Sequence, residues 1–440
     1  MGCARDARPV TAHPRSPALR AFRSFDYRRF LGSRLLSILG LEMVNVAVGW
    51  QVYALTRRPL DLGYVGLAQF LPPLFLTLPA GHAADRFDRR RVVLLCHLGF
   101  GVCSGLLAWL ALTEIRTPVP IFAVLVLLGT ARAFNAPAAQ ALMPSLLPEA
   151  DFPNAVAWNS STFQVANVVG PALGGVLYAL FGNPEAVYLL AAGLAVVDVL
   201  VLVGVKTRTG RMEHRAASWA TVLAGVRYVW ENKIVLGSVS LDLFAVLLGG
   251  AAALMPVFAQ DVLHTGAWGL GILRSGPALG AGLVGLYLAA HPLKRHVGRT
   301  MLTGVAIFGV STIAFGLSRT LWLSVLTLIV MGGADMLSVF VRLTVVQISP
   351  PPEMRGRVNA VNMLFIGASN ELGEFESGLT AQWLGPVRAV VAGGVGTLLV
   401  VLAWTRLFPS LRSLDRLPTE AVTAGVELEP TGAQAIAPPA

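Results

Sequence analysis

Seven acidic side chains of this 440-residue chain lie well inside long apolar stretches. They are Glu42, Asp198, Asp242, Asp335, Glu371, Glu374 and Glu376. A charged carboxylate at the centre of a membrane-spanning helix costs about 2.5 to 3.5 kcal/mol on insertion scales, so each is a candidate for function. Removal from water favours the neutral form of a carboxyl group. Such residues could therefore bind and release protons near neutral pH.

Two of these acids, Glu371 and Glu374, are three positions apart and share one face of a helix, whereas Glu376 points elsewhere. Two like charges at this spacing tend to hold one proton between them. We predict Glu371 and Glu374 as the first candidates for proton coupling, followed by Glu42 and Asp242.

A structural role is the alternative, because three arginines also lie in apolar stretches and need neutralising. They are Arg132, Arg274 and Arg342. Asp335 and Arg342, seven positions apart, suit a charge pair best, and Asp198 suits a hydrogen-bonded contact in the core. Polar amides in apolar stretches are better placed against water than against lipid. The amides that we predict to line a cavity are Asn45, Gln51 and Gln69.

The elements that must hold these residues are membrane-spanning helices. The chain is 55% hydrophobic and 13% charged, whereas an ordinary soluble domain carries about a quarter charged residues. A helix needs about 20 apolar residues to cross a hydrocarbon core, and twelve windows of this kind occur. They span residues 30–54, 61–82, 91–113, 118–145, 153–181, 185–205, 234–258, 267–290, 299–318, 320–347, 358–383 and 387–408. We predict an all-α membrane protein with twelve transmembrane helices.

The basic residues indicate the orientation of these helices. If the amino terminus is cytoplasmic, 25 of the 34 lysines and arginines fall on the cytoplasmic side and five on the opposite side. This asymmetry satisfies the positive-inside rule and puts both termini in the cytoplasm. The excess of arginine over lysine, 31 to 3, suggests a bacterial protein of the inner, cytoplasmic membrane. The net charge of +10 is then explained by topology, and no nucleic-acid partner is expected.

The organisation that follows has five segments. A basic cytoplasmic leader (1–29) precedes a first half of six helices (30–205) and a central loop (206–233), in which residues 216–233 have the spacing of an interfacial helix. A second half of six helices (234–408) is followed by a tail (409–440) that we predict to be disordered.

The two halves repeat each other. A shift of 203 residues superposes the fifth span on the eleventh, and a shift of 205 superposes the second on the eighth. The matched pairs include Asn167 with Asn370, Gly170 with Gly373, Gly175 with Gly378, Gly66 with Gly271 and Pro72 with Pro277. Two halves of the same orientation are typical of transporters that bind substrate near the midplane, between the repeats.

The loop after the second span, Gly81 to Arg91, carries a family signature. It resembles the major facilitator loop of glycine, three residues, Asp-Arg, one residue, glycine and then basic residues, except that Asp88 replaces the second glycine. The resemblance implies that Gly81, Asp85, Arg86 and Arg90 form a gating loop that latches the cytoplasmic face in the outward-open state. The equivalent loop of the second half, His291 to Arg299, has no acid, so its latch is expected to be weaker.

A second motif lies in the fifth span, at Gly170, Pro171, Gly174 and Gly175, and is similar to the antiporter motif of the same superfamily. Its small residues let helices approach closely and its proline permits a bend, so a simple packing interface is the alternative reading. The whole chain resembles the drug:proton antiporter branch that contains enterobactin exporters and macrolide efflux proteins. This implies a secondary active transporter that exports a small hydrophobic or amphiphilic molecule, drug- or siderophore-like, by proton antiport with alternating access.

Other mechanisms lack sequence support. None of the three lysines follows a glycine, so there is no phosphate-binding loop of an ATP-driven pump, and no catalytic motif indicates an enzyme. We expect no cofactor and no metal. The expected partners are a small-molecule substrate, protons and the lipid bilayer, with the protein acting as a monomer. A lysophospholipid flippase or uncoupled facilitator on the same fold is the alternative, and a transport-inactive membrane sensor is a more remote one.

Overall fold

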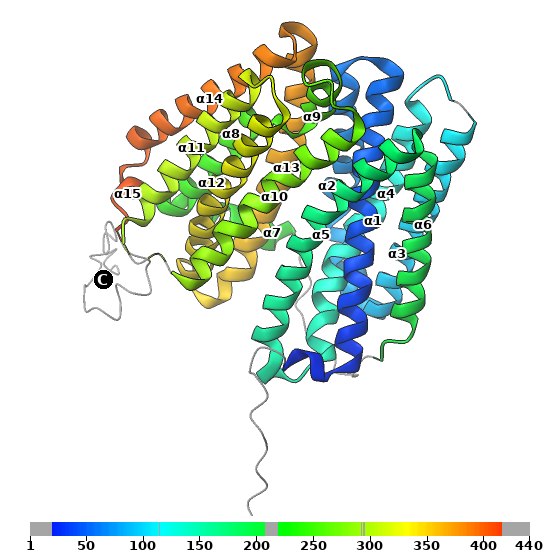
Figure 1. Ribbon diagram of the computed structural model, residues 1–440. Coiled ribbons are helices and arrows are strands. Elements are labelled where there is room, and N and C mark those ends of the chain that lie inside the picture. The colour runs from blue at the N-terminus through cyan, green and yellow to red at the C-terminus, as the bar shows by residue number, and fades with distance from the viewer. Residues whose placement is uncertain (1–19, 114, 207–218, 292, 294, 416–440) are drawn as a thin grey trace, which may run out of the picture.

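The computed structural model describes residues 20–113, 115–206, 219–291, 293 and 295–415 (Figure 1). Every regular element in this part of the chain is helical. The first half contains α1 (Phe25–Thr56), α2 (Pro59–Arg86), α3 (Arg89–Leu112), α4 (Val119–Leu142), α5 (Phe152–Phe181) and α6 (Glu185–Val203). Short 3-10 turns, η2 (Ala21–Arg23), η3 (Met143–Leu146) and η4 (Glu149–Asp151), flank α1 and α5.

The second half begins after a separate helix, α7 (Trp219–Glu231). Its first span is broken into α8 (Lys233–Gly249), η5 (Ala251–Leu254), α9 (Met255–Val257) and the π-helical turn η6 (Phe258–Val262). The remaining helices are α10 (Gly266–Ala290), α11 (Val297–Leu317), α12 (Leu321–Ile348), α13 (Pro352–Leu384), α14 (Pro386–Leu407) and the short α15 (Pro409–Arg412).

Ten of the described helical segments are long and apolar enough to cross a membrane, or eleven when the two parts of α2 are taken as one span. The protein is therefore a multi-pass membrane protein. Helix α13 is not among them, because Glu371, Glu374 and Glu376 interrupt its apolar sequence. Each of the twelve predicted windows coincides with a long helix or with the broken span from α8 to η6. The prediction of twelve helices in two six-helix halves is confirmed.

The two halves pack their helices in the same order. In the first half α1 packs on α5 and α6, α2 packs on α4, and α3 packs on α4 and α6. The second half repeats this pattern with α8 on α13 and α14, α10 on α12, and α11 on α12 and α14. The halves meet along two seams, α5 with α10 and α2 with α13, which are equivalent under the repeat.

Polar residues just outside the helices fix where several of them begin. The hydroxyl of Ser24 accepts the backbone N–H of Tyr27 at 3.2 Å at the start of α1. Asp88, the residue that departs from the loop signature, accepts the backbone N–H of Arg90 at 2.9 Å and caps α3. Such caps satisfy N–H groups that the first helical turn leaves unpaired. Asp88 therefore has a structural reason to stand where the signature has glycine.

Asp198 is fully buried in the first half and joins three helices. It accepts a hydrogen bond from the hydroxyl of Ser33 on α1, and its Oδ2 lies 2.7 Å from Nδ1 of His97 on α3. These contacts account for an acid in the apolar sequence of α6, as a hydrogen-bonded contact in the core.

The folded chain extends beyond the predicted segment boundaries. Helix α1 begins at Phe25, five residues before the predicted first span, and Arg29 on its first turns donates to the carbonyl of Gly204 after α6. The predicted tail begins at 409, whereas α15 buries Leu411 and Asp415 accepts the backbone N–H of His296 at 3.1 Å. Residues 1–19, 207–218 and 416–440, which hold most of the leader, the start of the central loop and the rest of the tail, lie outside the described part.

Helix α7 occupies the segment for which an interfacial helix is predicted. It packs on α13 and α8, and the hydroxyl of Tyr228 donates to the carbonyl of Ser349 at 2.9 Å. It thus belongs to the second half, at the end of the molecule where α15 also lies (Figure 1).

Candidate functional site

A cavity of about 550 Å³ lies between the two halves. Helices α1 and α5 line it from one side, and α8, α10, α12 and α13 line it from the other. Its polar lining consists of Glu42, Asn45, Gln164, Asn167, Arg274, Asp335, Asn370, Glu371 and Glu374. The structure thus brings Glu42, Asn45, Asp335, Glu371 and Glu374 together from separate parts of the sequence.

Glu371 and Glu374 meet α2 at a glycine. A Cβ atom placed on Gly66 would lie 2.6 Å from Oε2 of Glu374 and 3.3 Å from Oε2 of Glu371. Both carboxylates therefore reach the same spot and lie close to each other. A side chain on Gly66 would therefore displace the Glu374 carboxylate from this position.

Two arginines act on this pair of carboxylates. Arg132 and Arg274 are the cations whose charges bear on Glu371 and Glu374. Arg132 donates from Nη1 to Oε1 of Gln69 at 2.9 Å, and Nε of Arg274 is buried without a hydrogen-bond partner among the described residues. The acidic pair is thus near positive charge, but no ion pair within 4.0 Å neutralises it in the described part of the chain.

Asp242 lies outside the cavity lining. It is buried on α8 and forms an ion pair with Arg342 of α12, which is also buried. The pairing of Arg342 with Asp335 that the spacing favours is absent. Seven positions on one helix separate two Cα atoms by about 10.5 Å along the axis. Asp242 on the neighbouring helix is the nearer partner, which leaves Asp335 in the cavity wall.

Of the three amides that we predict to line the cavity, one does so and two bind other residues. Asn45 lines the cavity, Gln51 accepts the hydroxyl of Tyr188 at 2.7 Å, and Gln69 binds Arg132. The amides that sequence reasoning did not select for the cavity are Gln164, Asn167 and Asn370. The repeat contained a signal for two of them, because Asn167 and Asn370 superpose under the 203-residue shift.

Glycines bring the halves into close contact at one end of the molecule, which we call the closed end. A Cβ atom on Gly175 of α5 would lie 2.7 Å from Cα of Gly271 on α10. At the equivalent place of the other seam, a Cβ atom on Gly378 would lie 3.1 Å from Cα of Gly63 on α2. The two halves therefore touch backbone to backbone at both seams.

The antiporter-like motif takes part in this packing. Cβ atoms on Gly170 and Gly174 would lie 2.7 Å from Cβ of Glu42 and 2.9 Å from Cα of Met43, both on α1. The carbonyl oxygen of Pro171 would lie 2.6 Å from a Cβ atom on Gly271. The motif thus holds α5 against α1 within the first half and against α10 of the second.

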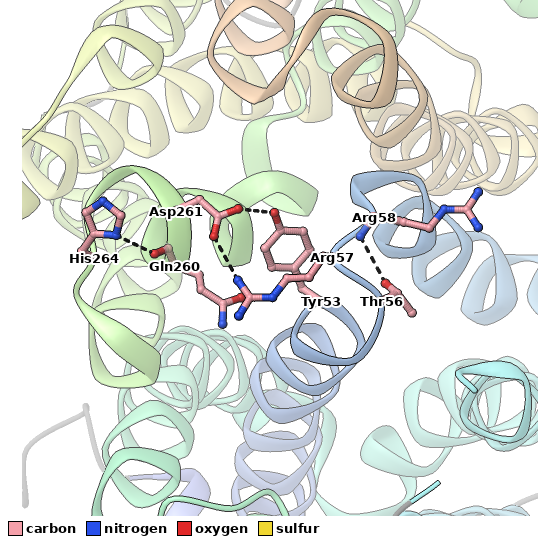
Figure 2. Close-up of polar contacts among 7 residues, drawn as sticks. All are labelled: Tyr53, Thr56, Arg57, Arg58, Gln260, Asp261 and His264. Atoms are coloured by element: carbon pink, nitrogen blue, oxygen red, sulfur yellow. Dashed lines mark hydrogen bonds and ion pairs between the residues drawn. The ribbon is translucent and has the colours of Figure 1, made fainter. Parts of the chain in front are cut away.

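A polar latch also joins the halves at the closed end, as Figure 2 shows. Asp261 in the π-helical turn η6 accepts the hydroxyl of Tyr53 and pairs with Nη1 of Arg57 at 3.2 Å. Tyr53 is in the last turn of α1, and Arg57 ends that helix in the left-handed conformation with φ of 54°. Sequence reasoning missed this latch because all three residues lie at span edges, where polar side chains are ordinary.

The gating loop lies at the opposite end, which we call the open end. Asp85 and Arg86 are exposed, Arg90 donates to the carbonyl of Val203 at the end of α6, and Arg89 donates to that of Ala141 at 3.2 Å. The hydrogen bonds of the Arg89 and Arg90 side chains thus stay inside the first half, and a Cβ atom on Gly81 would meet nothing within 4 Å. The halves lean together at the closed end and spread at the open end (Figure 1).

A membrane protein of two repeated six-helix halves around a polar central cavity has the architecture of a major facilitator transporter. Residues 17–429 match the family described as Transmembrane secretion effector, and the chain belongs to that family. It is therefore a transporter rather than an enzyme, and its resemblance to the branch of enterobactin exporters is confirmed.

Similar proteins cover nearly the whole chain. Enterobactin exporter EntS of Citrobacter koseri is 26% identical over 405 residues, which are 89% of this chain and 94% of that protein. EntS of Escherichia coli O6:K15:H31 is 25% identical over 414 residues, covering 91% and 95%. Among solved structures, the nucleoside transporter NupG superposes with a TM-score of 0.67 at 16% identity over 87% of this chain and 99% of its own. A bacterial homologue of the human lysosomal transporter Spinster, in an inward-facing and unoccupied conformation, gives 0.69 at 15% identity over 89% and 99%. The two structures support the fold alone.

Proposed function

We propose that this protein is a secondary active exporter that moves a small hydrophobic or amphiphilic molecule, drug- or siderophore-like, out of the cytoplasm in exchange for protons. The name of the EntS relatives supports export and a siderophore-like substrate. The observation that carries proton exchange is the position of Glu371 and Glu374, which lie both in the cavity wall and against Gly66 in the seam between α2 and α13.

The seam position suggests how proton binding and conformation are linked. With the closed end shut, Glu371 and Glu374 face the cavity. When α2 and α13 part at the closed end, the same carboxylates become reachable from the other side. A proton taken up there would be carried to the cavity as the halves rock back, which is alternating access. The gating loop with Asp85, Arg86 and Arg90 would latch the open end during the outward-facing step.

The direction of transport depends on the topology. The asymmetry of 25 basic residues against five supports a cytoplasmic open end with both termini inside and an inner-membrane location. We propose that the transporter acts as a monomer.

Proton exchange can be tested in inside-out membrane vesicles that carry the protein. The luminal pH is followed with a fluorescent probe while a catecholate siderophore, an amphiphilic dye or a fluorescent lysophospholipid is added outside. With the wild type, an exported compound should accumulate in the acidic lumen and release luminal protons, and a protonophore should stop both. Glu371→Gln and Glu374→Gln should reduce proton release to the background of empty vesicles.

The matched control is Glu376→Gln, since Glu376 lies on the same helix but not in the cavity lining. Accumulation that continues with a protonophore and in both cavity variants would contradict proton coupling and favour an uncoupled facilitator. Accumulation of the lysophospholipid alone would favour a flippase. No accumulation of any compound would favour the transport-inactive sensor.

A further inference from the structure

Another pocket, of about 430 Å³, lies on the second half and shares no lining residue with the central cavity. Its lining consists of Arg299, Leu302 and Thr303 of α11, Thr405 of α14 and Arg412 of α15. Helix α11 follows the loop that is equivalent to the gating loop, so the pocket lies at the open end. Two arginines and two threonines therefore line one space at the level where the spans end.

The positive charge of this pocket has no counterpart in the helices that form it. The sequences of α11, α14 and α15 contain no Asp or Glu. Asp415, the acid that follows α15, lies 2.9 Å from Nδ1 of His296 and also accepts the backbone N–H of that residue. Neither Arg299 nor Arg412 forms an ion pair within 4.0 Å with any residue of the described chain. The pocket is thus suited to an anion from outside the protein.

The polar groups of the lining match a phosphate. A guanidinium group stays charged at physiological pH and binds phosphate oxygens through paired N–H donors. Arg299 and Arg412 are exposed, so their N–H groups are accessible to a ligand. The exposed hydroxyl of Thr303 can donate a further hydrogen bond, whereas that of Thr405 already donates to the carbonyl of Leu402 at 2.7 Å. Two guanidinium groups and one hydroxyl can therefore bind one phosphate together.

An apolar surface continues from the pocket along the same helices. Ile307 and Val310 follow Thr303 at spacings of four and three, so all three residues share one face of α11. Both are exposed, as are Leu399 and Leu402 on the neighbouring helix α14. Seven residues of helix, from Thr303 to Val310, extend about 10.5 Å toward the middle of the span. This surface suits acyl chains, whereas a free phosphate ion would make no contact with it.

We propose that this pocket binds the phosphate headgroup of an anionic phospholipid, with Arg299 and Arg412 on the phosphate and the acyl chains along α11 and α14. Basic pockets between transmembrane helices bind anionic lipid headgroups of this kind. The lipid would join α15 to α11, in addition to the contacts that Leu414 and Asp415 make with the start of α11. The inference goes beyond the proposed function and holds whichever molecule the central cavity transports.

The choice of lipid is tested by native mass spectrometry of the purified full-length protein in detergent, which resolves each bound lipid. Cardiolipin, phosphatidylglycerol and phosphatidylethanolamine with the same acyl chains are titrated separately. The two anionic lipids should bind first, with a Kd about tenfold below that of phosphatidylethanolamine. Millimolar inorganic phosphate should not displace them. Equal affinity for all three lipids would overturn the inference, and displacement by inorganic phosphate would show a site for a soluble anion instead of a lipid.

Substitutions test whether the first lipid is in this pocket. Arg299→Gln and Arg412→Gln should each weaken its binding by about fivefold, and the double variant by about 25-fold. Arg299→Lys, which keeps the charge but loses the paired donors, should have a smaller effect. The matched control is Arg91→Gln, because Arg91 is exposed at the start of α3, the first-half equivalent of α11. An equal loss in the control would show a general attraction of the basic surface and would overturn the inference.

Thermal stability gives a second readout. A ligand that binds only the folded protein raises its Tm, so cardiolipin should raise the Tm of the wild type and of Arg91→Gln. The rise should be much smaller in the Arg299→Gln/Arg412→Gln variant. Scans without lipid identify a double variant that has lost its fold, in which case the two single variants decide. A rise in Tm as large in the substituted protein as in the wild type would show that the lipid acts elsewhere.

Discussion

The two seams between the halves are equivalent by the repeat, yet they are built differently. In the seam of α5 with α10, neutral groups form the contacts: the hydroxyl of Ser275 donates to the carbonyl of Val168 at 2.6 Å, and Nε2 of Gln164 donates to that of Ala278. In the seam of α2 with α13, the corresponding region holds Glu371 and Glu374.

The repeat shows where the two seams diverged. Under the 203-residue shift, Glu371 corresponds to Val168 and Glu374 to Pro171. The glycines at the closed end, Gly175 and Gly378, stayed the same in both seams. We infer that one seam serves as a neutral joint while the other carries the titratable groups, so that protonation can act on one side of a symmetric scaffold.

The largest effect is expected when the glycines that both seams share, Gly175 and Gly378, are replaced. In Gly175→Val and Gly378→Val, the new side chain meets the facing backbone, which cannot move aside locally. Each substitution should destabilise the closed end by about 2 kcal/mol, or roughly thirtyfold in population. The measurement is the distance between spin labels on Arg116→Cys and Arg319→Cys at the closed-end loops, in a background without the native cysteines.

The control for this experiment is Gly105→Val on α3, because a Cβ atom there meets nothing within 4 Å. A distance distribution that stays at the wild-type value in both seam variants would mean that these glycines do not hold the closed end.

Substitutions at two other equivalent glycines should have smaller effects that differ between the two seams. Gly66 and Gly271 are equivalent under the repeat, but a Cβ atom on Gly66 meets the flexible end of Glu374, whereas one on Gly271 meets the carbonyl oxygen of Pro171. Gly66→Ala should slow proton-driven transport by about tenfold and leave the spin-label distance unchanged. Gly271→Ala should lengthen that distance. If both variants behave alike, the division into a neutral and a titratable seam is wrong.

The smallest expected effect concerns the polar latch. The side chains of Arg57 and Asp261 are 60% and 40% exposed, so solvent screens their attraction and the pair contributes at most about 1 kcal/mol. Asp261→Asn should therefore shift the population toward opening of the closed end by about fivefold or less. The spin-label distance reports this shift, with Arg58→Gln as the control because its side chain points away from the latch (Figure 2). A shift as large as that of the seam glycines would mean that the latch contributes as much to closure as the glycines do.

The sequence predicted correctly those features of the fold that depend on the pattern of apolar residues. Hydropathy located the twelve spans. The sequence repeat pairs Asn167 with Asn370, and both residues line the cavity. Rotation of each helix about its axis is not readable from spacing within that helix, so the partner of Arg342 was assigned to Asp335 instead of Asp242. Gln51 and Gln69 were misjudged for the same reason, because an amide in a span binds whichever polar group the next helix presents.

The capping acids of the two halves come from different places in the chain. In the first half Asp88 lies in the loop itself and caps α3. In the second half the loop has no acid, and Asp415 from beyond α15 accepts the N–H of His296 while Leu414 accepts that of Gly298. Chains fold from the amino terminus during synthesis. The contacts of Arg29 with Gly204 and of Asp26 with Lys206 can thus form once the end of the first half has left the ribosome, whereas the contacts of His296 and Gly298 wait for Leu414 and Asp415 to be made.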